Sequence, residues 1–564
     1  MGSPETRRLP QEGRGIEFWL FLLALAIYGA GCCFRLGSAD LGSDEGRFGL
    51  SGANILADHR QLAVVSQDPL GPPGTMPYFY PLCLAGSISL LGRTEFALRF
   101  VNVLVLAIGG CFVWALAMFL SKSRLVAMLA SCLFLLNPGT IAYARTALPE
   151  ASVVAWGSGA LFAAARFYES EKVGWAGICG LCLGLAFLSK LWLVFPFLLA
   201  CLLLLAGGFL AGRKRGTVAG LALALVVFGA VSSSQLWLSL WLAPGAYSHW
   251  IQVCYVFTLK SRVGGAGYDP QMWYRPWWFY PAAFFKASFF GFPLLVLGFH
   301  ALVRRRRWLI LGVVGALLCP IAVFSLFRVK QATYIFPAFP GLALAVAYGI
   351  EDLFRHPARK TLIFGVLLSA AVSVFFYAKG VFGLRDLGAM LLLYSLYLVA
   401  AIARGPHQRR ARVLVAAASA LAMLFAGVVV IRRSLEHRTY YREIAAYFRP
   451  QLRGKEPQQV VFTSPEYPAL EFYTFRTGEY WETYYFHQSN SDFINGLKRG
   501  ASLFYVVDPT GVLYGGTPTE REWEALRRYA TEVTTEIERS IGHSLPLRVF
   551  VPTVASVGPG DGSR

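Results

Sequence analysis

The stretch that decides the fold is IEFWLFLLALAIYGAGCCF, from Ile16 to Phe34, followed closely by SDEGRFG, from Ser43 to Gly49. The first segment is long enough to cross a bilayer as a helix, which takes about 20 apolar residues. Apolar runs of similar length recur along the chain as far as Ile431. The mean hydropathy is +0.50, and 56% of the residues are hydrophobic while 15% are charged, unlike a soluble protein. The sequence therefore predicts a polytopic α-helical membrane protein.

The first apolar run could be a signal peptide, because Arg7, Arg8 and Arg14 precede it. However, no small-residue cleavage site separates the run from the acidic SDEGRFG stretch. We therefore expect this segment to be a retained first span.

The composition changes after Ile431. Residues 432–564 carry 16 basic and 16 acidic residues, whereas residues 1–431 carry 36 basic and 16 acidic ones. Most of the basic excess lies in short loops between apolar runs, which indicates membrane topology rather than nucleic-acid binding. We expect a transmembrane domain over residues 1–431 and a soluble domain over residues 432–564.

The basic loops predict how the chain threads through the membrane, because Lys and Arg are enriched in cytoplasmic loops. All the main basic loops face the cytoplasm if the amino terminus is inside and the short apolar stretch 78–91 lies on the surface. This threading places the carboxy-terminal domain outside the cytoplasm. It gives about 13 spans, at 16–34, 96–120, 125–143, 151–168, 173–189, 191–211, 216–241, 277–301, 308–326, 332–350, 361–377, 387–403 and 412–431.

The same threading gathers acidic, basic and aromatic side chains at the outer ends of the spans. We expect them to form one site, made of Asp44, Glu45, Arg47, Arg145, Glu150, Lys190, Lys260, Arg262, Lys330 and Tyr334. Acidic side chains near a membrane are costly unless they have a role. A carboxylate there could accept a proton from a hydroxyl nucleophile, and the cations could stabilise a departing phosphate. This set would suit an enzyme that acts on a lipid phosphate.

Each of these residues also has a simpler interpretation. Asp44 could cap the helix that begins near Gly46. Arg145 could simply form an ion pair with Glu150, without a role in substrate binding. Lys190 could simply extend its ammonium group to the membrane–water interface, and Tyr334 could belong to an aromatic belt. The two cysteines of the Cys179–Cys182 pair favour apolar packing over a metal site.

Two stretches around the acidic residues resemble a known family. SDEGRFGLSGANILAD and YARTALPEASV are similar to the acidic stretches of the bacterial aminoarabinose lipid A transferases and the protein O-mannosyltransferases, which share the GT-C membrane fold. The resemblance implies that Asp44 is the catalytic base. It also implies a catalytic role for Glu150, which stands where the family usually has Asp.

Two further stretches resemble segments of the same family. GLAFLSKLWLVFPFLL is similar to the helix that carries a lysine, here Lys190. FRVKQATYIFPAFPGLALAVA is similar to the "K-x-x-x-Y-I-L-P-x-x-P" stretch, here with Lys330, Tyr334 and Pro337. The resemblance implies substrate-binding roles for these residues and makes residues 1–431 a GT-C catalytic domain.

The chain also departs from the family pattern. The aminoarabinose transferases carry Tyr-Phe-Glu-Lys-Pro in the first outer loop, with a lysine that helps to hold the lipid phosphate. The corresponding segment here is Gly74-Thr75-Met76-Pro77, so Lys260 and Arg262 become the candidate phosphate ligands. The histidines of the family are missing before Pro276, so we expect no metal and no other cofactor. These departures imply a different donor or acceptor.

Residues 432–564 mix strand-like runs (QQVVFTS, ASLFYVVDP and LRVFVP) with helical ones (YYREIAAYFRPQL and EREWEALRRYATEVTTEIE), which predicts a small α/β domain.

The expected function is transfer of a sugar from a polyprenyl-phosphate carrier to a lipid, glycan or protein acceptor outside an inner membrane, in cell-envelope, lipopolysaccharide or protein glycosylation. The alternative is a transporter or flippase of polyprenyl-linked glycans. A transporter would favour ionisable residues at mid-membrane and matching repeat halves, and neither pattern is present.

Overall fold

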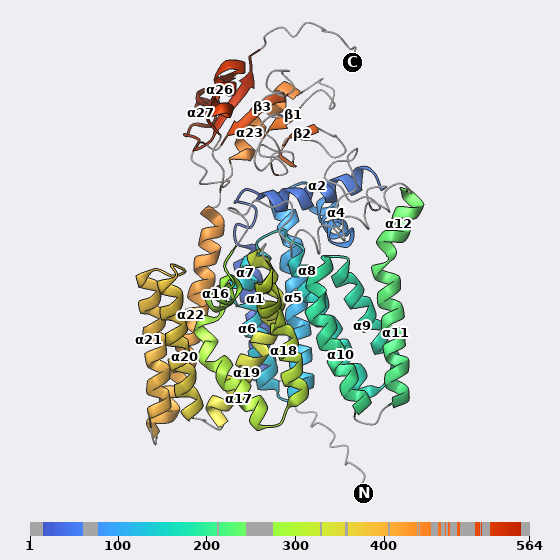
Figure 1. The fold of residues 1–564 in the computed structure, drawn as a ribbon, viewed down its shortest axis with the longest axis vertical. Coiled ribbons are helices and arrows are strands. Elements are labelled where there is room, and N and C mark those ends of the chain that lie inside the picture. The colour runs from blue at the N-terminus through green and yellow to red at the C-terminus, as the bar shows by residue number, and fades with distance from the viewer. Residues whose placement is uncertain are drawn as a thin grey trace.

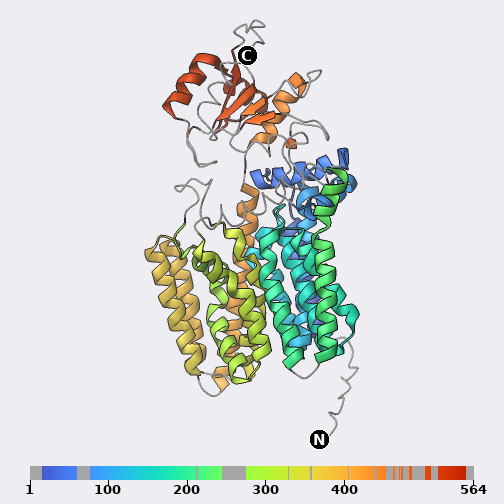
Figure 2. The same ribbon diagram turned by 45° about the vertical axis from the view of Figure 1, so that its right-hand side comes forward.

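The computed structural model describes residues 15–59, 62, 77–210, 214–243, 275–327, 330–355, 359–403, 406–436, 438, 440–452, 461–463, 469, 472–473, 482–484, 502–507, 509 and 519–553. Figures 1 and 2 show a bundle of long helices with a smaller domain built around a β-sheet beyond one end of it. We call this end of the bundle the sheet end. Helices α2 (Ser43–Ala57) and α4 (Phe79–Leu91) lie there, between the bundle and the sheet domain (Figure 1).

Helix occupies a part of every range that the sequence predicted as a span. The remaining helices of the bundle are α1 (Ile16–Cys33), α5 (Glu95–Ser121), α6 (Arg124–Leu135), α7 (Pro138–Ala144), α8 (Glu150–Ser170), α9 (Val173–Phe187), η1 (Leu191–Val194), α10 (Phe195–Leu210), α11 (Lys214–Ser232), α12 (Ser234–Leu242), α16 (Phe279–Ser288), η4 (Phe289–Gly291), α17 (Phe292–Arg304), α18 (Trp308–Val323), η5 (Phe324–Leu326), η6 (Ala332–Ala338), α19 (Phe339–Arg355), α20 (Arg359–Ala378), α21 (Leu384–Ile402) and α22 (Pro406–Glu436).

Fewer than 13 described helical segments are both long and apolar enough to cross a membrane. Among the described residues, nine helical segments are long and apolar enough to cross a membrane, or up to ten if the bent pair α6 and α7 is one span. Helix α9 and the described apolar part of α10 are apolar but shorter, with 10–17 residues each. Helix α8 has 21 residues but is rich in Ala, Gly and Ser and begins with Glu150. The fold class is confirmed, while the number of spans stays a prediction.

The bend between α6 and α7 follows from the sequence Asn137-Pro138. Proline cannot donate the backbone hydrogen bond that would continue α6, and the Asn137 side chain accepts a hydrogen bond from Gly139 N at 2.8 Å to start α7. The two helices meet at 55°.

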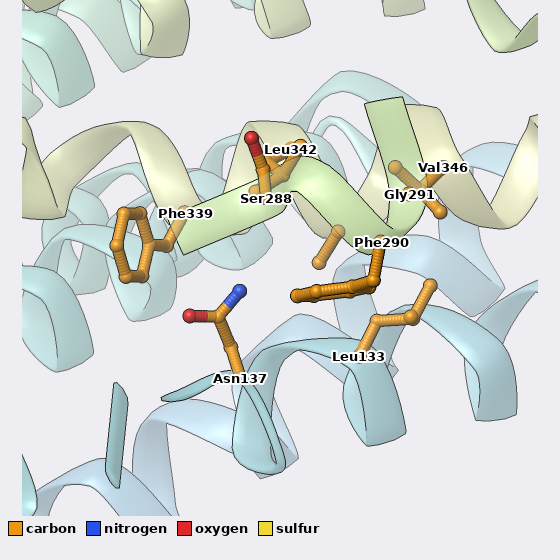
Figure 3. A pocket seen from close by; sticks show the side chains of 9 residues that line it. Leu133, Asn137, Ser288, Phe290, Gly291, Phe339, Leu342 and Val346 are labelled. Atoms are coloured by element: carbon orange, nitrogen blue, oxygen red, sulfur yellow. The ribbon is translucent and has the colours of Figure 1, made fainter. Parts of the chain in front are cut away.

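Figure 3 shows a gap beside Asn137 and Ser288, which encloses about 10 Å³. That is roughly the smallest space that holds one water molecule, so this gap is a packing defect rather than a ligand site.

The sheet domain contains five described strands in the order β2-β1-β3-β5-β4. They are β1 (Val461–Thr463), β2 (Glu482–Tyr484), β3 (Ser502–Val507), β4 (Ala530–Glu532) and β5 (Arg548–Pro552). β1 is parallel to β2 and β3, while β5 is antiparallel to β3 and β4. The helices of this domain are α23 (Tyr441–Phe448), η7 (Arg449–Leu452), α26 (Glu520–Tyr529) and α27 (Thr534–Ile541).

One local prediction about this domain is wrong. The run EREWEALRRYATEVTTEIE is not one continuous helical segment, because β4 separates α26 from α27. The β-branched residue Thr531 favours extended backbone in β4. Directly after the strand, Val533 N donates a hydrogen bond to Val549 O at 2.8 Å. Pairing with β5 therefore outweighs the helical propensity of the flanking residues.

An apolar cluster of described residues joins the sheet domain to the bundle. Leu41 and Phe48 of the α2 region pack in it with Tyr80 of α4, Leu98 of α5 and Phe448 of α23. This cluster is separate from the main core of the bundle. The sheet domain thus rests directly on the segment that carries Asp44 and Glu45.

Candidate active site

Helix α2 begins with two adjacent acidic residues in different environments. Its N-cap is Gly42, and the Glu45 side chain accepts a hydrogen bond from Gly42 N at 2.9 Å, in the manner of a capping box. Asp44 lies within the first turn and is not the cap. The interpretation of Asp44 as a helix cap is therefore wrong, and the adjacent Glu45 makes that contact instead.

Glu45 is buried against Arg99 of α5. Arg99 Nε donates to Glu45 Oε1 at 2.8 Å, Arg99 Nη2 donates to Oε2 at 2.9 Å, and Ala147 N donates to Oε1 at 2.9 Å. Burial alone would raise the pKa of Glu45, but the Arg99 guanidinium and the backbone donors of Gly42 and Ala147 lower it below its ordinary value. Both oxygens are thus engaged, which favours a structural role over the substrate-binding role that we predicted.

Arg99 and Asn102 are important residues of this region that sequence reasoning missed. Arg99 also donates to the carbonyl oxygens of Leu36, Ala39 and Asp40, at 3.1, 2.8 and 2.7 Å. One turn further along α5, Asn102 Nδ2 donates to Leu148 O at 2.8 Å. A buried polar pair at the start of an apolar run was the signal that could have revealed them. Together they fix the segments that precede α2 and α8.

Asp44 itself points away from this buried network. Its side chain is 62% exposed, and Arg47 Nη1 lies 3.9 Å from Asp44 Oδ1. A pair at this distance and exposure contributes little to stability. The helix start is held by Glu45, so Asp44 has a fixed backbone position and an accessible carboxylate.

The second acidic residue, Glu150, is buried and paired with Lys190. Glu150 is the first residue of α8, and Lys190 follows α9. Lys190 Nζ lies 2.5 Å from Glu150 Oε1, with side chains that are 22% and 2% exposed. Within the described part of the chain, Glu150 Oε2 has no hydrogen-bond partner. The pair therefore leaves one buried carboxylate oxygen without a hydrogen-bond partner.

Tyr334 of η6 lies beside Lys190 and adds an aromatic ring to this group. Lys190 Nζ lies 5.5 Å from the centre of the Tyr334 ring, a distance suited to a cation–π contact. Tyr334 is buried in η6, and its neighbour Phe336 stacks on Tyr143 with the ring centres 4.0 Å apart. The structure thus brings together Glu150, Lys190 and Tyr334, which are three of the ten residues that the sequence analysis placed in one site.

Arg145 and Lys330 are turned toward backbone carbonyl groups. Arg145 Nη1 donates to Cys32 O at 2.7 Å and Phe34 O at 2.9 Å, at the end of α1. The suggested Arg145–Glu150 ion pair is not present among the described contacts. Lys330 Nζ donates to Arg275 O at 3.1 Å and to Phe327 O, and burial lowers its pKa. Neither cation is presented to a ligand in this arrangement.

Two candidate phosphate ligands, Lys260 and Arg262, lie outside the described residues, as do Gly74 to Met76. In the ranges that are described, no group of three His, Cys, Asp or Glu side chains could hold a metal ion.

The sequence is similar to known glycosyltransferases over part of its length. The family model for dolichyl-phosphate-mannose-protein mannosyltransferase matches residues 75–233. A curated undecaprenyl phosphate-α-4-amino-4-deoxy-L-arabinose arabinosyl transferase from Pectobacterium atrosepticum is 28% identical over 308 residues, which cover 50% of this chain and 52% of the relative. The homologous protein of Pectobacterium carotovorum is 27% identical over 321 residues, with the same shares covered. The match thus spans about half the length of these relatives.

Solved structures share the fold over a much longer part of the chain. ArnT from Cupriavidus metallidurans, solved bound to undecaprenyl phosphate, has a TM-score of 0.62 at 15% identity and covers 97% of this chain and 100% of its own. The arabinosyltransferase EmbB from Mycobacterium smegmatis has a TM-score of 0.51 at 14% identity, with 77% of this chain and 42% of its own covered.

The protein is therefore a polytopic membrane protein with the GT-C fold of membrane glycosyltransferases. The comparisons also confirm the resemblance to polyprenyl-phosphate-sugar transferases that the four sequence motifs indicated.

Proposed function

We propose that this protein is a glycosyltransferase that moves a sugar from a polyprenyl-phosphate carrier to a hydroxyl or phosphate of a lipid, glycan or protein acceptor. The observation that carries the proposal is the arrangement of the two acidic residues at the sheet end. Asp44 is exposed at a fixed helix start, and Glu150 is buried beside Lys190. An accessible base and a cation at the same end of the bundle are the groups that such a transfer requires.

In the proposed reaction Asp44 is the general base. The acceptor oxygen loses its proton to the Asp44 carboxylate and forms a bond to the anomeric carbon of the sugar. The bond between that carbon and the phosphate oxygen breaks, and the polyprenyl phosphate leaves with the bonding electrons. Lys190 would stabilise the developing negative charge, and its side chain is partly exposed. Through their ion pair, Glu150 would hold the Lys190 ammonium group in place beside the substrate.

The setting of the reaction is also part of the proposal. The basic loops support an orientation in which the sheet end and the sheet domain face away from the cytoplasm of an inner membrane. We propose that no metal is required, because Lys190 together with Lys260 or Arg262 would neutralise the leaving phosphate.

The substitution Asp44→Asn tests the assignment of the base. Asparagine keeps the size of the side chain but loses its charge and basicity, so turnover should fall on the order of 10²-fold or more. Stability should change by about 1 kcal/mol or less, because the side chain is exposed and affects only the helix dipole. The experiment compares turnover, thermal unfolding and donor-lipid binding in detergent-purified protein.

The matched control is Asp386→Asn. Asp386 is also an exposed acidic residue in the first turn of a helix, α21, where it accepts a hydrogen bond from Gly383 N at 3.2 Å. Its substitution therefore removes the same charge from a helix start. We expect turnover of this variant to stay normal. Wild-type turnover in Asp44→Asn would disprove the assignment and make Glu150 the next candidate for the base.

A further inference from the structure

A polar cavity lies at the end of the bundle opposite to the sheet end. It encloses about 400 Å³, within the range of about 300–1,000 Å³ that is usual for small-molecule sites. Its walls come from the start of α1, the turn between α5 and α6, the turn between α17 and α18, and the end of α19. In Figure 1 these segments lie far from α2 and the sheet domain. The cavity is therefore distinct from the candidate active site.

The lining of this cavity is strongly basic. It holds the basic residues Lys122, Arg124, Arg305, Arg307 and Arg355 and the two acidic residues Glu17 and Glu351. The lining residues carry an excess of three positive charges, of which Lys122 also pairs with Glu169 outside the lining, at 2.8 Å. Such a concentration of positive charge attracts anions and repels cations.

Two buried acidic residues hold part of this basic wall in a fixed geometry. Glu351 and Asp352 of α19 are 3% and 0% exposed. Arg305 Nη1 lies 2.7 Å from Glu351 Oε2, and Arg305 Nη2 lies 3.2 Å from Asp352 Oδ1. Arg355 also pairs with Glu351, at 3.2 Å. These contacts order the guanidinium groups before a ligand arrives, which lowers the entropic cost of binding.

The turn after α17 brings a further arginine to the cavity. Arg306 has a left-handed conformation with φ of 52°, and Arg307 N donates to Leu302 O at 2.9 Å. This is the hydrogen bond of a Schellman turn at a helix end. As a result Arg305 and Arg307 line the cavity, whereas Arg306 does not.

Arg307 and Tyr348 supply donors that the protein itself leaves without a good acceptor. Among the described residues Arg307 takes part in no ion pair, unlike Arg305 and Arg355. The hydroxyl group of Tyr348 is buried near Arg307 and Ser121 but makes no hydrogen bond of good geometry in the described structure. A guanidinium and a hydroxyl together suit the oxygen atoms of a phosphate group.

We propose that this cavity binds the phosphate group of an anionic phospholipid. Basic pockets between membrane helices on the cytoplasmic side are suited to such headgroups. The position of the cavity beside the basic loops at a bundle end favours a lipid over a soluble anion, because lipid headgroups lie at that depth. The site would anchor α1, α5, α17 and α19 to one lipid molecule, independently of the reaction at the sheet end.

The test measures how many phosphatidylglycerol molecules the purified full chain retains in native mass spectra. Wild-type protein should retain one more molecule of phosphatidylglycerol than of phosphatidylcholine. Arg307→Gln should weaken this retention about fivefold, since one basic residue near anionic lipid contributes a factor of that order. The matched control Arg306→Gln removes the same charge from the next position, which does not line the cavity, and should retain the lipid as the wild type does.

Further variants and probes make the result decisive. Tyr348→Phe removes one hydroxyl donor without a change of charge and should weaken retention about threefold, so it replaces Arg307→Gln if that variant does not fold. A parallel series with inorganic phosphate identifies the source of the anion. Equal loss in Arg306→Gln and Arg307→Gln would overturn the proposal. A response to inorganic phosphate with none to phosphatidylglycerol would equally overturn it.

Discussion

Two neighbouring residues at the start of α2 differ sharply in environment. Glu45 has both oxygens bound by Arg99 and backbone donors in the protein interior, whereas Asp44 is exposed. The two side chains differ by one methylene group, so position on the helix surface decides their roles. Glu45 lies on the face that packs on α5, and Asp44 lies on the face that remains accessible. This arrangement makes Glu45 the anchor that positions Asp44.

Glu45 should govern part of the dependence of stability on pH. Its pKa is lowered in the folded protein, so the stabilisation is present above the ordinary carboxyl pKa and is lost as the pH falls through the lowered value. Glu45→Gln leaves Arg99 buried without a charged partner, which should cost about 3–5 kcal/mol at neutral pH.

Thermal unfolding of Glu45→Gln and wild type between neutral pH and strongly acidic pH checks this prediction. The two unfolding temperatures should approach each other as the solution is acidified below the ordinary glutamate pKa, because the wild type then loses the stabilisation that the variant already lacks. A difference that stays constant over this range would contradict the role of Glu45. Asp44→Asn serves as the control, with an unfolding temperature close to that of the wild type throughout.

At the scale of elements, the sheet domain holds the segment between α1 and α2. Arg442 of α23 pairs with Asp40 at 3.5 Å and with Glu95 at the start of α5. Tyr440 N donates to Asp40 Oδ2 at 3.0 Å, and Leu41 N donates to the hydroxyl oxygen of Tyr473 at 2.8 Å. The domain thus fixes the residues that lead directly into the α2 helix.

Arg442→Ala should therefore loosen this segment. Arg442 is partly exposed, so we expect a cost of about 1 kcal/mol, or roughly fivefold faster amide hydrogen exchange in residues 37–48. Mass spectrometry of the exchanged peptides measures the change. Arg438→Ala is the control, because Arg438 pairs only with Glu443 at 3.5 Å among the described contacts and should leave the exchange unchanged. Equal exchange in Arg442→Ala and wild type would contradict this role of the domain.

The sequence allowed most elements of the bundle to be predicted, and the reason is physical. Long apolar runs and short basic loops are local features, so helix positions could be read along the chain. Glu150, Lys190 and Tyr334 were predicted only as members of a ten-residue site, because all three lie at predicted span ends on one side. The Glu45–Arg99 pair was not, because its partners are 54 residues apart and only packing of α2 on α5 brings them together.

Short strands were the other limit of sequence reasoning. β2 and β4 have three residues each, too few for a period of two to emerge. Their extended conformation depends on pairing with β1 and β5, which are distant in the sequence. The contacts of Arg145 were also not predicted. Its partners are the carbonyl groups at the end of α1, and only the tertiary fold brings them close to it.

At the scale of the whole molecule, the threading predicts which sites are accessible from each side of the membrane. A cysteine at Thr517 or Gly264 should react with an impermeant thiol reagent added outside intact cells, and one at Gly405 should react only after the cytoplasmic side is opened. All three positions lie outside the described residues, so the labelling is independent of the structure. The unsubstituted protein measures the background from its native cysteines. A cytoplasmic Thr517 would contradict both the threading and the proposed orientation of the active site.

The central claim, transfer of a sugar from a polyprenyl phosphate, distinguishes this protein from a transporter of the same lipid. The most direct measurement supplies polyprenyl phosphates that carry different radiolabelled sugars to membranes containing the protein, and follows both the label and the lipid. We predict that one labelled sugar becomes bound to an acceptor while an equal amount of free polyprenyl phosphate appears, and that Asp44→Asn membranes do neither. Movement of the intact labelled lipid across the membrane, with no release of polyprenyl phosphate from any donor, would contradict the account.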